Sequence, residues 1–254
     1  FFLKLKMERA ISLVDKAETL KEFSIEAPSD LKPTLNSKFW RLYGHPLCPY
    51  VERAKLALEH HKINYQNVHV SLPDRPDWVF KYHRGAVPIL EFEDGKYIAE
   101  STLIIEVVDD LITKNTERSD IISLYPKDPV ERAARKMFLD KFRDLGLFMF
   151  RAILTKKKEK REKDIQRIEG LIGILEEELK RSTTDYYYSE ENYGFVDLIL
   201  FCQVKQILVL SDQIDWSMKS FPNVEKWVNA IKFDPRLING INKEEDLKTM
   251  ISVF

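Results

Sequence analysis

The spacing of apolar residues in the first half of the chain alternates between the periods of strands and helices. Aromatic-rich residues 39–43 predict a short strand that ends at Gly44, and Val51, Ala54 and Leu58 recur at helical spacing after it. Later segments continue this alternation. The predicted order is a strand over 39–43, a helix over 49–61, a strand over 67–70, a short helix near 78–80, a hairpin over 87–98 and a helix from residue 101.

The hairpin has the strongest local signal, because Asp94-Gly95 between two apolar runs favours a tight turn. A strand–helix–strand crossover makes parallel strands, and the terminal hairpin adds an antiparallel pair. This order of elements is that of the thioredoxin-like fold, an α/β class.

The second half of the chain shows helical periodicity and no convincing strand alternation. Apolar stripes predict helices over 130–150, 165–179 and 224–231, and the nearly all-apolar run 195–210 predicts a buried core helix. A polar stretch that ends at Pro129 has the composition of a linker. The predicted divisions are an N-terminal extension (1–37), an α/β domain (38–114), a linker (115–128) and an all-helical domain (129–254).

Composition excludes several classes of protein. With 44% hydrophobic and 32% charged residues, the 254-residue chain is globular rather than disordered. A net charge of -1 gives no reason to expect nucleic acid or an anionic membrane as a partner, and no apolar run is long enough to cross a bilayer. Two cysteines make no disulfide framework and suggest a reducing, cytoplasmic location. We interpret residues 1–7 as a truncated end or a tail rather than a signal peptide.

Cys48 lies at the turn between the first predicted strand and the first predicted helix. Pro49 suits the first helical position, so Cys48 falls at a helix N-terminus, where free N–H groups and the helix dipole favour an anion. We therefore predict a reactive thiol with a pKa lowered into the range of roughly 3.5–7.5. The alternative is a buried, inert cysteine, which we predict for Cys202 in its apolar run. Val51, three positions after Cys48, leaves no local resolving cysteine.

Two further features flank the predicted hairpin. Pro88 precedes a strand, where its missing N–H removes no hydrogen bond between strands. A cis Val87-Pro88 bond would turn the Val87 backbone toward the helix N-terminus at Cys48. Glu100-Ser101 stands at the turn into the next helix, which Ser101 is expected to cap. N–H groups, a hydroxyl and a carboxylate in one place would also suit a zwitterionic peptide.

In combination these motifs resemble the cytosolic glutathione transferases, most closely the omega class. The resemblance runs from about residue 39 to about residue 247. It is carried by Cys48-Pro49-Tyr50-Val51-Glu52-Arg53, Pro76-Asp77-Trp78, Val87-Pro88-Ile89-Leu90-Glu91, Glu100-Ser101, Tyr125-Pro126-Lys127-Asp128-Pro129 and Ala230-Ile231-Lys232-Phe233-Asp234-Pro235. It implies a thioredoxin-like glutathione-binding domain and an all-helical domain that contributes the second-substrate pocket.

The resemblance also implies residue roles. The thiol of glutathione, the co-substrate, would face Cys48, and the Val87 backbone before a cis Pro88 would pair with the cysteinyl backbone. Glu100 and Ser101 would hold the γ-glutamyl end.

This chain departs from the family pattern at several positions. Arg75 stands where the family commonly has a Lys that contacts glutathione. Because the planar guanidinium of Arg can bind a carboxylate with two hydrogen bonds, we expect glutathione binding to be retained with altered geometry. Leu247 stands where omega members often place a Trp over the second-substrate pocket, so substrate preference does not carry over. The usual capping box of the second domain pairs Ser or Thr with an Asp three positions later; here Gly194 stands at the first position and Asp197 at the second. Segment 81–86 is one residue shorter than expected.

The implied activity is glutathione-dependent thioltransferase and dehydroascorbate reductase activity, with little conjugation of electrophiles. Cys48 would form a mixed disulfide with glutathione, which a second glutathione would release. Expected substrates are small oxidised or electrophilic compounds and mixed disulfides. The family is usually homodimeric, and we expect a homodimer. No metal site is predicted, because no ligand cluster accompanies His60-His61.

Three alternatives stay open. Tyr43 is a rival to Cys48, because a tyrosine hydroxyl stabilises the glutathione thiolate in the conjugating classes. A non-enzymatic, redox-regulated protein on the same fold would be similar to the chloride intracellular channel proteins, which lack a pair such as Glu100-Ser101. A carrier that binds a hydrophobic ligand in its second domain without turnover is the third.

Overall fold

A computed structural model describes residues 23–24, 32, 38–71, 75–114, 121–187 and 192–251. The chain divides into two compact units. The first contains the residues up to Ser123 together with 239–241, and the second contains Leu124–Ile238 and the residues from Asn242 on. Most of the predicted extension (1–37) and residues 115–120 of the predicted linker lie outside the described residues, so the predicted domain boundaries stay predictions.

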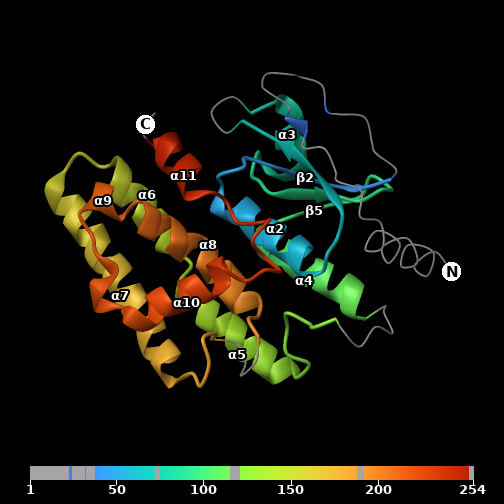
Figure 1. Cartoon of the computed structure of the whole chain (residues 1–254). Helices are drawn as coiled ribbons and strands as arrows, with labels where there is room; N and C mark the ends of the chain where they lie inside the picture. The colour runs from blue at the N-terminus through green and yellow to red at the C-terminus, as the bar shows by residue number, and fades with distance from the viewer. Residues whose placement is uncertain are drawn as a thin grey trace. The chain divides into compact units, whose positions relative to one another are not determined.

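The first unit contains a mixed five-stranded sheet in the order β1-β3-β2-β4-β5 (Figure 1). The strands are β1 (Phe23–Ser24), β2 (Trp40–Gly44), β3 (Tyr65–His69), β4 (Ile89–Glu91) and β5 (Tyr97–Ala99). β3 is parallel to both β1 and β2, whereas β4 is antiparallel to both β2 and β5. The predicted crossover and hairpin are therefore confirmed. The short edge strand β1, within the predicted extension, was not predicted.

Three helices cover this sheet: α2 (Pro49–His60), α3 (Asp77–His83) and α4 (Ser101–Thr113). α2 and α4 pack against each other, and α3 lies on the opposite side of the sheet (Figure 1). The core under α3 is built from strand and helix residues that the apolar pattern had marked. They are Tyr43, Val68, Val70, Trp78, Val79 and Ile89. The predicted thioredoxin-like fold is confirmed.

The second unit is helical throughout its described residues. Its helices are α5 (Pro129–Asp140), α6 (Leu145–Leu154), α7 (Lys158–Arg181), α8 (Phe195–Val209), α9 (Ser211–Ile214), the 3-10 helix η1 (Met218–Ser220), α10 (Pro222–Lys232) and α11 (Glu244–Ile251). The buried helix α8 packs against α5, α6, α9, α10 and α11, which confirms the predicted core helix and the all-helical class. The apolar stripe over 130–150 is two helices, because the chain turns at 141–144.

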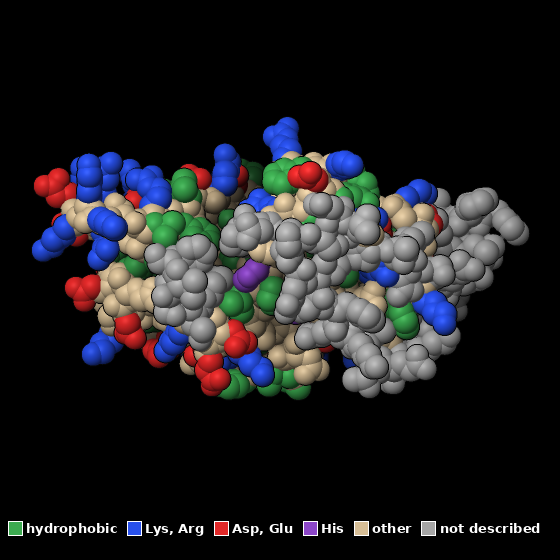
Figure 2. Space-filling view, turned by 90° about the horizontal axis from the view of Figure 1, so that it is seen from above, with side chains coloured by type: hydrophobic (Ala, Val, Ile, Leu, Met, Phe, Trp, Pro, Cys, Tyr) green, Lys and Arg blue, Asp and Glu red, His purple; other side chains and the backbone are tan. Residues whose placement is uncertain are grey.

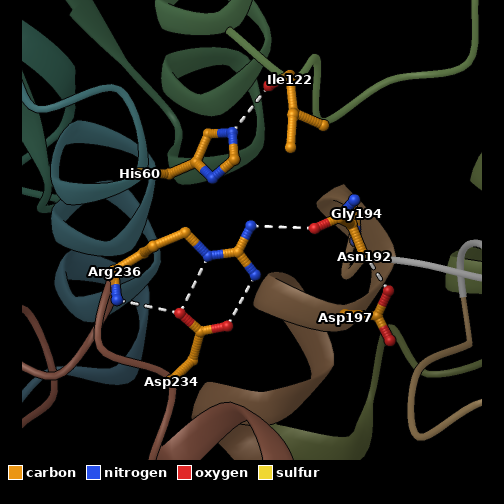
Figure 3. Close-up of polar contacts among 7 residues, drawn as sticks. All are labelled: His60, Ile122, Asn192, Gly194, Asp197, Asp234 and Arg236. Atoms are coloured by element: carbon orange, nitrogen blue, oxygen red, sulfur yellow. Dashed lines mark hydrogen bonds and ion pairs between the residues drawn. The ribbon is translucent and has the colours of Figure 1, made fainter. Parts of the chain in front are cut away.

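Buried carboxylates hold the loops around α8 in place (Figure 3). Asp197 accepts a hydrogen bond of 2.8 Å from the N–H of Gly194, so half of the capping box forms without a side-chain oxygen at the N-cap. Asp234 accepts from Nε and Nη2 of Arg236 at 2.9 and 2.6 Å. Nη1 of Arg236 donates to Asn192 at 2.9 Å, which ties the loop after α10 to the chain before α8.

Surface charge is mixed in sign. Lysine and arginine side chains alternate with acidic ones among the coloured residues of the face in Figure 2, in keeping with the near-zero net charge. None of the described helices combines the length and the apolar composition needed to span a membrane.

Gly44 places the end of β2 directly against α2. A Cβ built at Gly44 would lie 2.3 Å from Cγ2 of Val51, a buried residue of the first turn of α2. We expect Gly44→Ala to lower the free energy of unfolding by about 1–3 kcal/mol, because the helix must move away from the strand. Urea denaturation followed by circular dichroism measures this change.

Gly170→Ala is the matched control. Gly170 is exposed inside α7, and a Cβ there meets nothing within 4 Å. This substitution should raise stability by roughly 0.5–1 kcal/mol, because alanine favours the helix. Equal destabilisation by the two substitutions would contradict the close approach at Gly44.

Candidate functional site

Cys48 occupies the N-cap position of α2, as the sequence predicts. It follows β2 with extended backbone angles (φ -74°, ψ 123°), and Pro49 is the first helical residue. The carbonyl of Cys48 accepts the first helical hydrogen bond, from the N–H of Glu52 at 3.0 Å. The thiol therefore lies beside the unpaired N–H groups of a helix N-terminus.

The predicted lowering of the Cys48 pKa is wrong. Cys48 as a residue is partly exposed, but protein encloses its thiol, and this burial raises the pKa. The N–H groups of Tyr50 and Val51 and the Arg53 guanidinium act in the opposite direction, since each favours the thiolate. The helix end thus offsets only part of the cost of burying the charge.

A cavity of about 200 Å³ lies in the same unit. Its lining residues come from the first turn of α2, the end of α3, the loop before β4 and the start of α4. They are Tyr50, His83, Ala86, Val87, Pro88, Glu100 and Ser101. Four of the five predicted glutathione-binding residues are therefore brought together, whereas Cys48 is not among the residues that line this cavity.

The backbone at two sides of the cavity has uncommon geometry. The Val87-Pro88 bond is cis, as the resemblance implied. Glu100 has φ 71° and ψ 112°, a conformation that non-glycine residues rarely adopt and that clusters at functional sites. Glu100, and not Ser101, is the N-cap of α4, and no side chain caps this helix. The expectation that Ser101 caps α4 is therefore wrong.

Ser101 instead contacts a residue that the sequence reading did not assign to the site. Its hydroxyl lies 3.4 Å from Nη1 of Arg53, and both residues are buried. The Arg53 guanidinium also lies over the ring of Tyr50, 4.7 Å from its centroid. Arg53 therefore links the first turns of α2 and α4. Its presence in the Cys48-to-Arg53 motif was the only sequence signal for this role.

His83 lines the cavity and was not among the predicted site residues. Its Nε2 lies 2.6 Å from Oε1 of Glu100. The contact joins residues 17 positions apart on two elements, so no local pattern could indicate it. Its place just after a short predicted helix, before Gly85, was the only hint.

The remaining predicted site residues lie elsewhere. Arg75 does not line the cavity and donates from Nη1 to the carbonyl of Gly85 at 2.8 Å. Leu247 is buried in α11 of the helical unit, and its predicted place in a second-substrate pocket stays a prediction. Tyr43 is buried in the core and donates to Oε2 of Glu91 at 2.7 Å.

Tyr43 is a poor rival to Cys48 in this environment. Burial, followed by the hydrogen bond to the Glu91 carboxylate, raises the pKa of the Tyr43 hydroxyl. This hydroxyl is already donated to a buried acceptor, so it is not available to a glutathione thiolate.

The two adjacent histidines have structural partners. Nε2 of His61 lies 2.9 Å from Oδ1 of Asp109, and both side chains are buried. His60 contacts the carbonyl of Ile122 at 2.7 Å (Figure 3). Among the described residues, no group of three or more His, Cys, Asp or Glu side chains could hold a metal ion.

Comparison with known families matches both halves of the chain. Residues 42–115 match the N-terminal domain of glutathione S-transferase, and residues 137–233 match its C-terminal domain. The chain belongs to the glutathione S-transferase family. The two matched segments include the cavity and the buried helix α8.

Individual relatives place this member near the omega class. The chain is 29% identical to pyrimidodiazepine synthase of Drosophila melanogaster over 207 residues, which cover 78% of this chain and 79% of the relative. It is 25% identical to glutathione S-transferase omega-1 of Rattus norvegicus, with 77% of each chain covered. The structure of rice glutathione transferase GST1 in complex with glutathione matches with a TM-score of 0.69 at 17% identity, covering 85% of this chain and 95% of that chain. The last match shows the shared fold.

The raised pKa of Cys48 predicts alkaline reactivity. Below its pKa a thiol carries little thiolate, so the rate of alkylation by iodoacetamide should rise with pH to a midpoint above the ordinary value of about 8.5. The rate is measured by mass spectrometry from pH 5 to 11. Cys48→Ala is the control, because Cys202 is buried and should react only on unfolding. A midpoint below that of a free thiol would contradict the dominance of burial.

Proposed function

We propose that this protein is a glutathione-dependent thiol-disulfide reductase, of the thioltransferase and dehydroascorbate reductase type, that acts through a mixed disulfide of Cys48 with glutathione. One observation carries the proposal. A cysteine, and no hydroxyl residue, occupies the N-cap of α2, and Tyr50 in the first turn of the same helix lines the cavity. Val51 in the place of a second cysteine favours a monothiol mechanism.

With a glutathionylated substrate, the reaction consists of two thiol-disulfide exchanges. The Cys48 thiolate attacks the glutathione sulfur of a glutathionylated substrate, so a Cys48–glutathione disulfide forms and the substrate thiolate leaves. The thiolate of a second glutathione then attacks the glutathione sulfur of this disulfide. Oxidised glutathione is released and the Cys48 thiolate is restored. The substrate is reduced and one free glutathione is consumed, because oxidised glutathione joins this molecule to the glutathionyl group that the substrate carried.

The raised pKa of Cys48 is compatible with this chemistry but moves its optimum. Less thiolate is present at neutral pH than in a thiol with a lowered pKa, although a more basic thiolate is a stronger nucleophile. The N–H groups at the start of α2 and the Arg53 guanidinium are the groups that support the thiolate.

Glutathione binding is assigned to the residues that the resemblance indicates. The Val87 backbone before Pro88 pairs with the cysteinyl part, and Glu100 and Ser101 hold the γ-glutamyl end. Arg75 supplies a positive charge on the loop before α3, at the position where the family commonly has Lys. The helical domain, with Leu247, contributes the pocket for a small oxidised or electrophilic substrate, and the protein acts in the cytoplasm.

Covalent capture of glutathione tests the mechanism directly. Intact-mass spectrometry after incubation with oxidised glutathione should show one added glutathionyl group on the wild type and none on Cys48→Ala. Glutathione-dependent reduction of hydroxyethyl disulfide should fall to background in the same variant. Cys202→Ala is the matched control and should keep both properties, because Cys202 is buried and its Sγ contacts the Leu198 carbonyl.

Other outcomes would favour the alternatives. An adduct that persists in Cys48→Ala would contradict the assignment of the nucleophile. Absence of an adduct together with failure to bind immobilised glutathione would favour a non-enzymatic protein on the same fold, similar to the chloride intracellular channel proteins. Tight binding of a hydrophobic ligand without reductase activity would favour a carrier.

We also propose that the chain forms a homodimer, as the family usually does. Apolar residues on one stripe of α5 are exposed in the helical unit: Val130 is 75% and Met137 is 73% exposed, seven positions apart. Such a stripe is typical of a contact surface.

A charge on this stripe should weaken a homodimer. We expect light scattering to give twice the mass of one chain for the wild type, and a concentration-dependent decrease toward one chain for Met137→Glu. Phe233→Glu places the same charge on another exposed apolar residue of the unit and should leave the mass unchanged. A wild-type mass of one chain at all concentrations would contradict the proposal.

A further inference from the structure

His83 and Glu100 form a polar pair in the wall of the cavity. Nε2 of His83 lies 2.6 Å from Oε1 of Glu100, and both residues line the cavity. His83 is the last residue of α3, and Glu100 is the N-cap of α4. Among the residues that the structure describes, none hydrogen-bonds the other carboxylate oxygen, Oε2. One oxygen is therefore held, and the other is available.

We propose that His83 is a positioning residue that holds the Glu100 carboxylate ready to receive the ammonium group of the γ-glutamyl end of glutathione. This inference rests on the proposed function. The Glu100 side chain is 58% exposed, and an exposed glutamate loses rotamer freedom when it binds a ligand. Holding Oε1 before binding reduces this loss and leaves Oε2 to accept a hydrogen bond from the ligand.

The backbone sets the two residues in place independently of their contact. After His83 the chain turns through two residues with positive φ, Arg84 (50°) and Gly85 (74°). A Cβ at Gly85 would lie 2.5 Å from the Phe80 ring, so this turn needs glycine on both counts. Glu100 has its own positive φ of 71°. Loss of the His83 side chain should therefore leave both backbones where they are.

A purely structural role for the pair is the alternative. His83 is 33% exposed and Glu100 is 58% exposed, and a pair this exposed contributes little to folding stability. His83 donates from Nε2 whether the ring is neutral or protonated, provided that the neutral ring carries its proton there. Glutamine can donate a similar hydrogen bond, and alanine cannot. The two substitutions therefore separate the hydrogen bond from the volume of the side chain.

The experiment measures glutathione affinity and steady-state kinetics in a double-mutant cycle. Calorimetry gives the dissociation constant of glutathione for wild type, His83→Ala, His83→Gln, Glu100→Gln and His83→Ala/Glu100→Gln. We expect His83→Ala to weaken binding by about 10-fold, the effect of a hydrogen bond to a charged group. His83→Gln should restore most of the affinity. In the Glu100→Gln background His83→Ala should change the affinity by less than about 2-fold.

Kinetics add a readout that a structural role would not move. With hydroxyethyl disulfide as the second substrate, His83→Ala should raise the KM for glutathione and leave kcat at saturating glutathione unchanged. His60→Gln is the matched control, because His60 contacts a backbone carbonyl and does not line the cavity. Thermal denaturation should give similar Tm values for all variants.

Several outcomes would overturn the inference. It would be overturned if His83→Ala bound glutathione with wild-type affinity, or if this substitution weakened binding equally in the wild-type and Glu100→Gln backgrounds. A fall in kcat at constant KM for glutathione would also overturn it. Its failure is distinguishable from failure of the proposed function. In the first case wild type still forms the Cys48 adduct, whereas in the second neither glutathione binding nor an adduct is observed.

Discussion

The packing of α2 on α4 is the constraint on which the site depends. Cys48 stands at the start of α2, and Glu100 and Ser101 stand at the start of α4. Arg53 joins the two starts, because its guanidinium contacts the Ser101 hydroxyl from the second turn of α2. The same guanidinium favours the Cys48 thiolate. One buried cation therefore serves both the alignment of the helices and the charge balance at the thiol.

The site combines a rigid frame with a few uncommon backbone positions. The sheet sets the direction of β2 and β4, and the approach of Gly44 to Val51 fixes the distance between β2 and α2. Around the cavity the chain adopts positive φ at Gly85 and Glu100. Such conformations cost free energy and are kept where the surrounding structure determines them. Here they place the His83 and Glu100 side chains in one wall.

Cys48 shows that a place at a helix N-terminus does not by itself lower the pKa of a thiol. The helix end, its N–H groups and a nearby guanidinium all favour the thiolate. Enclosure of the sulfur acts against them and has the larger effect. Burial also raises the pKa of Tyr43, and the hydrogen bond that its hydroxyl donates to the buried Glu91 carboxylate acts in the same direction.

The sequence by itself determined the elements and their order, because capping, turn chemistry and apolar spacing act over a few residues. Cys48-Pro49 marked the start of α2, Asp94-Gly95 marked the hairpin, and the apolar run that became α8 marked the core of the second domain. The family motifs indicated four residues that the cavity brings together.

Only the tertiary structure decided which side chains meet across these elements. Arg53 and Ser101 are 48 residues apart, and His83 and Glu100 are 17 apart, so their contacts follow from helix packing and strand register rather than from local pattern. The pairing of β1 with β3 and the raised pKa of Cys48 were likewise decided by the tertiary structure. Long-range pairing and burial depend on the whole fold, and no short stretch of sequence carries them.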